Sequence, residues 1–226
     1  LTAARHFRLE VEIGSIAPGR KADILLVPDL TEMRPSRVYF DGRLVAEQGA
    51  LLEPCQAADY PEWILHTVHL KRPITPAAFR KETGAAGDRV RVNVIDLIDR
   101  QIINRRLVTE LPCANGEILP DISRDIAKLA VVERYGKTGG VGIGFARGFG
   151  LKKGALAYST SHDHHNIVTV GADDADMALA VNTVVEMQGG LAVVCGGEVL
   201  AKMCLPIGGL MSTKPAEEVM AEQDAM

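Results

Sequence analysis

Aromatic side chains and excess positive charge are both scarce in this sequence. Phe, Trp and Tyr together make up 4% of the 226 residues, and 25 Lys and Arg residues face 29 Asp and Glu, for a net charge of -4. Proteins that bind nucleic acid usually need a basic patch, aromatic platforms for base stacking, or both. The composition therefore predicts no nucleic-acid partner.

Long apolar runs and closely spaced cysteine pairs are also missing. No apolar stretch approaches the roughly 18 residues that a membrane-spanning helix requires, and the N-terminus lacks the layout of a signal peptide. No C-x-x-C pair is formed by Cys55, Cys113, Cys195 and Cys204. Such spacing is typical of reduced thiols, so we expect a cytoplasmic protein with no membrane contact.

Phosphate-binding motifs are absent, although glycine recurs between residues 136 and 154. A dinucleotide site needs G-x-G-x-x-G between a strand and a helix, and a P-loop needs G-x-x-x-x-G-K-[ST]. Neither order occurs in V-G-I-G-F-A at residues 141–146 or around it. We therefore interpret this segment as glycine-rich strands in which backbones approach closely or bulge.

The apolar residues, 47% of the chain, are spaced as in an α+β fold with two domains. Residues 1–52 begin with a short helical segment and continue as a small β unit whose hairpin turns at Asp41-Gly42. Residues 53–74 are rich in proline and are interpreted as a linker that packs on the surface. The second domain, residues 75–226, is expected to contain strands at 89–96, 101–110, 125–133, 167–170, 191–195 and 198–204, and helices at 174–187 and from 214.

The densest group of polar and titratable side chains is S-T-S-H-D-H-H-N at residues 159–166, which holds three of the six histidines. Neutral imidazoles bind Zn, Mn or Fe, and a histidine with a pKa near ~6.5 can transfer protons. If the segment is extended, alternation places His162 and His164 on one face, where they could form a metal-binding pair. The alternative is a buried polar turn that fixes the start of the strand at 167–170.

Two upstream patterns resemble the C-terminal edge of amidohydrolase-superfamily enzymes. G-x-I-x-P-G-x-x-A-D is present at residues 14–23, and D-G-x-x-V follows at residues 41–45. In that superfamily the corresponding segment follows the last helix of a (β/α)8 barrel and completes a small flanking β-sandwich. The resemblance implies that residues 1–52 are the end of a barrel helix and a sandwich edge, without catalytic residues.

The downstream sequence resembles the C-terminal domain of bacterial adenine deaminases. The resemblance is carried by V-V-E-R-Y-G-K-T at residues 131–138, F-A-R-G-F-G-L-K-K-G-A-L-A-Y-S at 145–159, H-D-H-H-N-I at 162–167, D-A-D-M-A-L-A-V-N at 174–182 and L-P-I-G-G-L-M-S at 205–212. It implies a metal-dependent hydrolase that converts adenine and water to hypoxanthine and ammonia. The implied fold class is α+β: a β-rich remnant of the flanking sandwich is followed by a mixed α/β domain, with the barrel outside this chain.

In the enzymes that this sequence resembles, a divalent metal, commonly Mn or Fe, is bound inside the barrel. We therefore expect no metal ligand in this chain and do not assign the barrel's ligands to His162-Asp163-His164. Residues 159–166 are expected to reach the mouth of the barrel, in the same or a neighbouring subunit. The candidate catalytic contributors are His162, Asp163 and His164, and the candidate substrate-binding residues are Ser161, His165 and Asn166.

The resemblance implies three partners: adenine, the protein's own catalytic barrel, and further copies of the chain in a homo-oligomer. The domain at residues 75–226 is expected to stop short of the family's usual C-terminus. The alternative is a non-catalytic assembly or regulatory domain of another amidohydrolase, in which the glycine-rich strands and the helix at 174–187 pair subunits.

Overall fold

The computed structural model describes residues 1–53, 59–84 and 87–226. The chain forms two compact units, Leu1–Ala58 and Asp59–Met226, here called the N-terminal and C-terminal units. The division falls inside the linker expected at residues 53–74, of which residues 54–58 lie outside the described part of the chain. The observed class is α+β, as predicted.

The N-terminal unit is a four-stranded antiparallel sheet in the order β1-β2-β3-β4, preceded by one short helix. Asp41 and Gly42 both have positive φ, 48° and 76°, which is the geometry of the tight turn predicted there. Ala4 is the only buried residue in the described part of this unit, so the sheet has little core of its own. The elements are α1 (Thr2–His6), β1 (Ile24–Leu26), β2 (Arg37–Phe40), β3 (Arg43–Glu47) and β4 (Ala50–Leu51).

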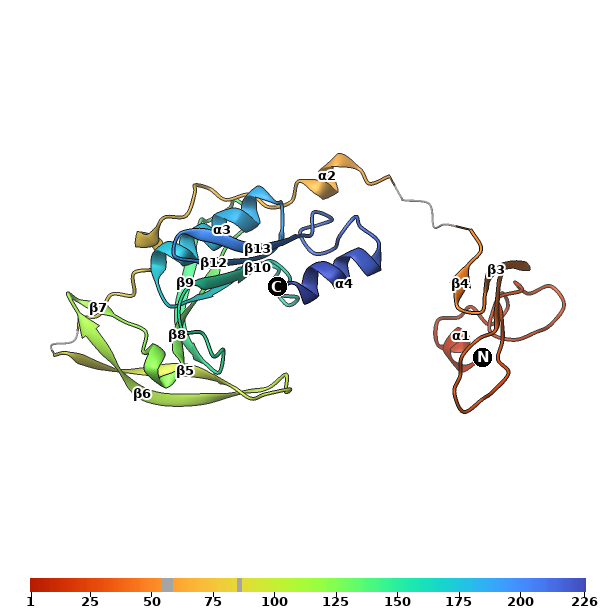
Figure 1. Ribbon diagram of the computed structural model, residues 1–226, viewed down its shortest axis with the longest axis horizontal. Coiled ribbons are helices and arrows are strands. Elements are labelled where there is room, and N and C mark those ends of the chain that lie inside the picture. Colours follow the sequence, from red (N-terminus) through yellow and green to blue (C-terminus); the bar gives the residue numbers. More distant parts are fainter. Residues whose placement is uncertain (54–58, 85–86) are drawn as a thin grey trace. The chain divides into compact units, whose positions relative to one another are not determined.

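The C-terminal unit is built on a nine-stranded sheet in the order β13-β12-β10-β11-β8-β9-β5-β6-β7 (Figure 1). Neighbouring strands are antiparallel except β5 and β9, which pair in parallel. The strands are β5 (Arg89–Leu97), β6 (Asn104–Ala114), β7 (Glu117–Ile118), β8 (Ile126–Val132), β9 (Val141–Arg147), β10 (Ala155–Tyr158), β11 (Ile167–Gly171), β12 (Gly190–Cys195) and β13 (Glu198–Cys204).

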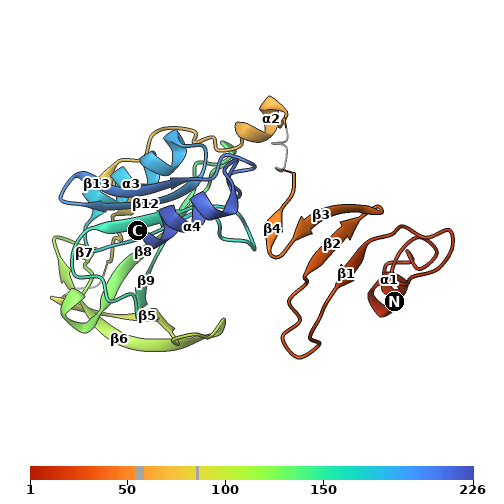
Figure 2. The ribbon, with the colours of Figure 1, turned by 45° about the vertical axis from the view of Figure 1, so that its right-hand side comes forward.

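One long helix, α3 (Asp174–Glu186), packs across β10, β11 and β12 and forms the main core with them (Figure 2). Strand residues such as Ala155 and Ala157 share this core with Met177, and their small side chains let the helix lie close to the sheet. The Asp173 carboxylate accepts two backbone N–H groups of the first turn at 3.1 and 2.9 Å, which confirms the predicted helix start. The other helical segments are α2 (Glu62–Leu65), the 3-10 turns η1 (Pro76–Phe79) and η2 (Ile122–Arg124), and α4 (Ala216–Asp224).

Residues 59–74 belong to the C-terminal unit and do not form a linker. Val68 and Ile74 are 1% and 8% exposed and belong to the same core as the buried residues of α3. The side chain of Asn182 hydrogen-bonds the backbone of Ile74, 108 residues away in the sequence. The expected domain start at residue 75 therefore moves to about residue 59, because side chains on α3 hold the preceding segment in place.

Two strands can be compared directly with the sequence patterns. The glycine-rich segment at residues 141–146 is a strand, β9, as predicted. The strand predicted at 101–110 begins only at Asn104, because the β5–β6 hairpin turns just before it and Gln101 N–H donates to Ile98 O at 3.1 Å.

Within the described ranges, no helix has the length and apolar character needed to cross a bilayer. The cysteines in those ranges, Cys113, Cys195 and Cys204, are free thiols.

Candidate functional site

Residues 159–166, here called the histidine loop, connect the ends of β10 and β11, two neighbouring inner strands of the sheet. The middle of the loop forms a turn, and His165 has a positive φ of 52°. The extended conformation that would place His162 and His164 on one face is not adopted, so the condition for a metal-binding pair there is not met. The loop folds back on itself instead, and the His165 N–H donates to Ser161 O at 2.7 Å.

His164 uses both ring nitrogens inside the loop. Its Nδ1 accepts the backbone N–H of Asn166 at 3.0 Å, and its Nε2 lies 3.2 Å from Ser161 Oγ. Because Nδ1 is an acceptor, the neutral ring carries its proton on Nε2 and donates it to the Ser161 hydroxyl. Neither nitrogen is left for a metal ion or for proton transfer, so this geometry gives His164 a structural part in the loop.

His162 and Asp163 form the tip of the histidine loop and are exposed. Neither side chain makes a hydrogen bond or an ion pair with any other residue that the structure describes, and the same holds for the half-buried His165. These groups are therefore available to contact a molecule or a domain beyond the described chain. A catalytic or binding contribution to a site located elsewhere requires this availability.

The base of the histidine loop, in contrast, is held tightly. Ser159 is fully buried, its hydroxyl donates to Gly209 O at 2.6 Å, and it accepts the Gly190 N–H at 2.8 Å. At the other end, the Asn166 Oδ1 accepts the backbone N–H of Arg134 at 3.4 Å. The loop thus combines a fixed base with a free tip, an arrangement suited to presenting side chains in a defined position.

The neighbouring β8–β9 turn is organised by Glu133, which sequence-based prediction missed. Its carboxylate accepts the N–H groups of Tyr135, Thr138 and Gly139 at 2.6, 3.0 and 3.0 Å. The hydrogen bond from Gly139, followed by those from Thr138 and Tyr135, lowers the pKa of Glu133 to about 2. Tyr135 in turn donates its hydroxyl to His164 O at 3.1 Å, so the turn supports the histidine loop. The position of a glutamate directly before a glycine-rich turn could have indicated this role from the sequence.

Potential metal ligands do not converge in this chain. Across the residues that the structure describes, no group of three or more His, Cys, Asp and Glu side chains could hold one metal ion. The residues present here do not fit the divalent metal that the resemblance implies. The assignment of that metal to a barrel outside the chain stays a prediction.

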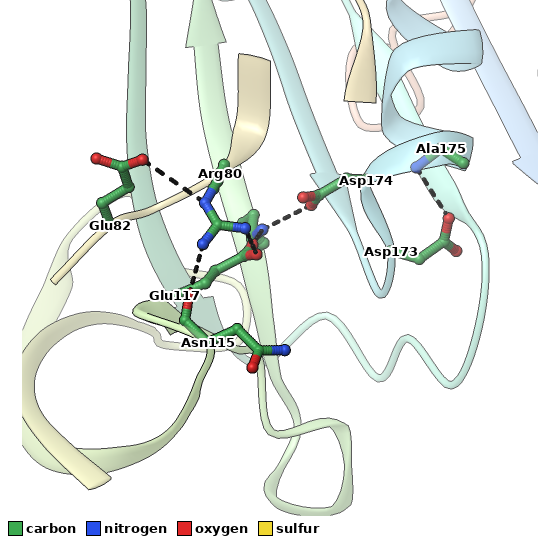
Figure 3. A network of polar contacts seen from close by, with 8 residues as sticks. Arg80, Glu82, Asn115, Glu117, Asp173, Asp174 and Ala175 are labelled. Atoms are coloured by element: carbon green, nitrogen blue, oxygen red, sulfur yellow. Dashed lines mark hydrogen bonds and ion pairs between the residues drawn. The ribbon is translucent and has the colours of Figure 1, made fainter. Parts of the chain in front are cut away.

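A second polar cluster lies where β7, β8 and α3 meet, and the sequence did not predict it (Figure 3). Lys128 is 2% exposed, and its Nζ lies 2.6 Å from Asp174 Oδ1 and 3.0 Å from Glu117 Oε1. Arg80 approaches Glu117 at 3.3 Å and donates to Asn115 O at 2.6 Å. Because each charge faces a partner of opposite sign, we interpret the cluster as a set of ion pairs that holds β7, β8 and α3 together. A lysine inside the apolar strand I-A-K-L-A-V-V was the available signal.

Comparison with known proteins decides the family. Residues 101–226, more than half of the chain, match the family model described as Adenine deaminase C-terminal domain. The chain belongs to this family. It is 48% identical to an adenine deaminase of Desulforamulus reducens and 45% identical to one of Moorella thermoacetica, in both cases over its whole length. It is also 44% identical to adenine deaminase 1 of Carboxydothermus hydrogenoformans over 94% of the chain.

The chain spans 38%, 38% and 34% of the lengths of these three relatives. The part that matches the adenine deaminase C-terminal domain contains both the histidine loop and the β8–β9 turn. The predicted resemblance is thereby confirmed at the level of the family.

Proposed function

We propose that this chain is the C-terminal portion of an adenine deaminase, which hydrolyses adenine to hypoxanthine and ammonia, and that the histidine loop contributes to its purine site. The observation that carries the proposal is the geometry of that loop within a domain of this family. Its base is fixed by buried hydrogen bonds, whereas His162 and Asp163 are exposed at its tip.

The proposal places the remaining parts of the reaction outside this chain. A (β/α)8 barrel would hold the divalent metal, Mn or Fe, whose chemistry is the activation of a water molecule. The N-terminal unit would be the edge of a β-sandwich beside that barrel, as the patterns at residues 14–23 and 41–45 indicate. We propose no residue of this chain as a metal ligand, and we place the whole enzyme in the cytoplasm.

The tip of the histidine loop suits binding and proton transfer. An imidazole can donate or accept a hydrogen bond and can take up or release a proton. A carboxylate accepts hydrogen bonds from amino and ring N–H groups such as those of a purine. His162 and Asp163 fit these parts better than Ser161, His164 and Asn166, whose side chains are engaged at the base or inside the loop.

The test is made in the full-length enzyme with His162→Ala and Asp163→Ala. Loss of a group that binds or transfers a proton is expected to lower kcat/KM for adenine about 100-fold, with the melting temperature almost unchanged. His66→Ala and Asp99→Ala are matched controls, because these side chains are 62% and 93% exposed on other segments. If both loop variants keep normal kcat/KM, the histidine loop has no part in the reaction.

A second candidate is the assembly of a homo-oligomer, and the sheet face opposite α3 favours it. Alternation along β10 and β12 turns Leu156, Tyr158, Leu191 and Val193 to that face, and each is half-buried. Contiguous apolar residues of this kind are typical of a surface that another protein molecule covers. Light scattering of the full-length protein should show an oligomer that Leu191→Lys dissociates. A monomeric wild-type protein would exclude this role.

A further inference from the structure

Arg134 has a buried guanidinium at the start of the β8–β9 turn. The residue is 3% exposed, and its Nη2 donates to Gly208 O at 2.9 Å. Gly209 packs directly against Nη1, and a Cβ at this glycine, whose φ is +71°, would overlap with that nitrogen. The guanidinium therefore fills the space beside two consecutive glycines and depends on the absence of side chains there.

The same arginine is connected to both ends of the histidine loop. Its backbone N–H donates to Asn166 Oδ1 at 3.4 Å, at the C-terminal end of the loop. At the N-terminal end, the Ser159 hydroxyl donates at 2.6 Å to the carbonyl of Gly209, the glycine against which the guanidinium packs. One residue thus holds one end of the loop directly and the other end through a single glycine.

Packing alone does not explain a guanidinium at this position. Its Nε and Nη1 are buried without a hydrogen-bond partner in the described chain, and it forms no ion pair there. The Tyr135 ring, whose centroid lies 5.6 Å from Cζ, is the aromatic partner of this cation. Burial of a cation without an ion pair is nevertheless unfavourable, and an apolar side chain of similar length would fill the space without that penalty. What the guanidinium adds is a directed hydrogen bond and a rigid planar surface, and both restrict where the backbone of the two glycines can lie.

We propose that Arg134 is a positioning residue for the deamination reaction, which orients His162 and Asp163 by fixing both ends of the histidine loop. The inference rests on the proposed function, because Arg134 acts only through the tip of that loop. Displacing a contributing group by about 1 Å can lower a rate about 100-fold, so a small shift of the base is enough to be measured.

The first test is a double-mutant cycle in the full-length enzyme. Arg134→Met removes the side-chain donors and keeps the length of the side chain, and it leaves in place the backbone N–H that binds Asn166. We expect kcat/KM to fall about 10- to 100-fold in the otherwise wild-type enzyme. In the His162→Ala/Asp163→Ala background the same change should cost less than about twofold, because the positioned groups are gone. Arg134→Lys, which keeps the charge and one directed donor, should restore part of the activity. Equal losses in both backgrounds overturn the inference.

The second test measures the loop directly, by hydrogen exchange in the full-length enzyme. Arg134→Met should speed amide exchange over residues 160–166. Arg134→Gln, which removes the guanidinium and shortens the side chain, should do the same and carries the test if Arg134→Met does not fold. Arg147→Met is the matched control, since Arg147 is bound to Asp96 at 2.8 and 2.9 Å in another part of the sheet. Unchanged exchange over the loop in both Arg134→Met and Arg134→Gln overturns the inference.

These tests also separate the positioning role from the proposed function. Full activity of the His162→Ala/Asp163→Ala enzyme overturns the proposed contribution of the histidine loop, and the role of Arg134 in the reaction fails with it. Low activity of that enzyme, together with normal activity and normal exchange in Arg134→Met, overturns the positioning role alone.

Discussion

Asn182 hydrogen-bonds both backbone groups of Ile74, accepting its N–H at 3.1 Å and donating to its carbonyl at 2.8 Å. A primary amide has one acceptor and one donor side, so it can pair with an extended residue much as a neighbouring strand does. Gln188 binds Val68 in the same way, at 3.2 Å for both bonds. These two amides supply the partners that a segment outside the regular strands would otherwise lack.

Asn182→Leu should therefore destabilise the C-terminal unit. The substitution keeps the approximate volume but leaves the N–H and the carbonyl of Ile74 without partners, so the free energy of unfolding should fall by about 2–3 kcal/mol. Urea unfolding measures the change. Asn93→Leu is the control, because Asn93 binds only the exposed Arg106 side chain and its loss should cost less than about 1 kcal/mol. Similar losses in both variants would contradict the role assigned to Asn182.

Lys128→Met should be strongly destabilising. It leaves Asp174 and Glu117 facing each other without the buried ammonium between them, and breaking a buried ion pair on one side typically costs about 3–5 kcal/mol. Urea unfolding of Lys214→Met provides the comparison, because Lys214 pairs with Glu222 in an exposed position where the expected cost is below about 1 kcal/mol. A Lys128→Met protein as stable as wild type would show that the cluster does not fasten α3 to the sheet.

The lowered pKa of Glu133 predicts a loss of stability in acid. The N–H groups of the β8–β9 turn lower its folded-state pKa from an ordinary 4.5 to about 2, so the contribution is fully present above about pH 4.5. It is lost as the pH falls through that range toward 2, because the unfolded chain takes up the proton first. In urea unfolding at pH 7 and at pH 2.5, Glu133→Gln should be less stable than wild type at pH 7, with most of the difference gone at pH 2.5. Glu186→Gln, at an exposed position, serves as the control for the removal of one carboxylate.

Ser159 and Ser161 should respond differently to the loss of their hydroxyls. Ser159→Ala leaves the Gly190 N–H and the Gly209 carbonyl unpaired in the core, which should cost about 1–3 kcal/mol and lower kcat/KM as well. Ser161→Ala removes one contact to His164 in a half-buried position and should cost less than about 1 kcal/mol. Thermal unfolding and steady-state kinetics of the full-length enzyme check both. Equal effects of the two substitutions would contradict the fixed base of the histidine loop.

The features that sequence patterns predicted depend on residues a few positions apart. The Asp41-Gly42 turn, the Asp173 helix start and the glycine-rich strand β9 all have the expected conformation. The family, too, was predicted from its motifs. The conformation of the histidine loop was not predicted, because it depends on hydrogen bonds between its base and three distant residues. Gly190 and Arg134 donate backbone N–H groups to the base, and the Gly209 carbonyl accepts the Ser159 hydroxyl.

Short-range patterns thus defined the class of the fold, most of its strands, its family and the polar group to test. Long-range contacts decided the strand order and the start of the C-terminal unit. They also decided which polar side chains are buried and which groups they hydrogen-bond. Ser159 meets Gly209 50 residues later, Lys128 meets Asp174 46 residues later, and Asn182 meets Ile74 108 residues earlier. Burial and hydrogen bonding are properties of such pairs, and local propensity carries no information about a partner that distant in the chain.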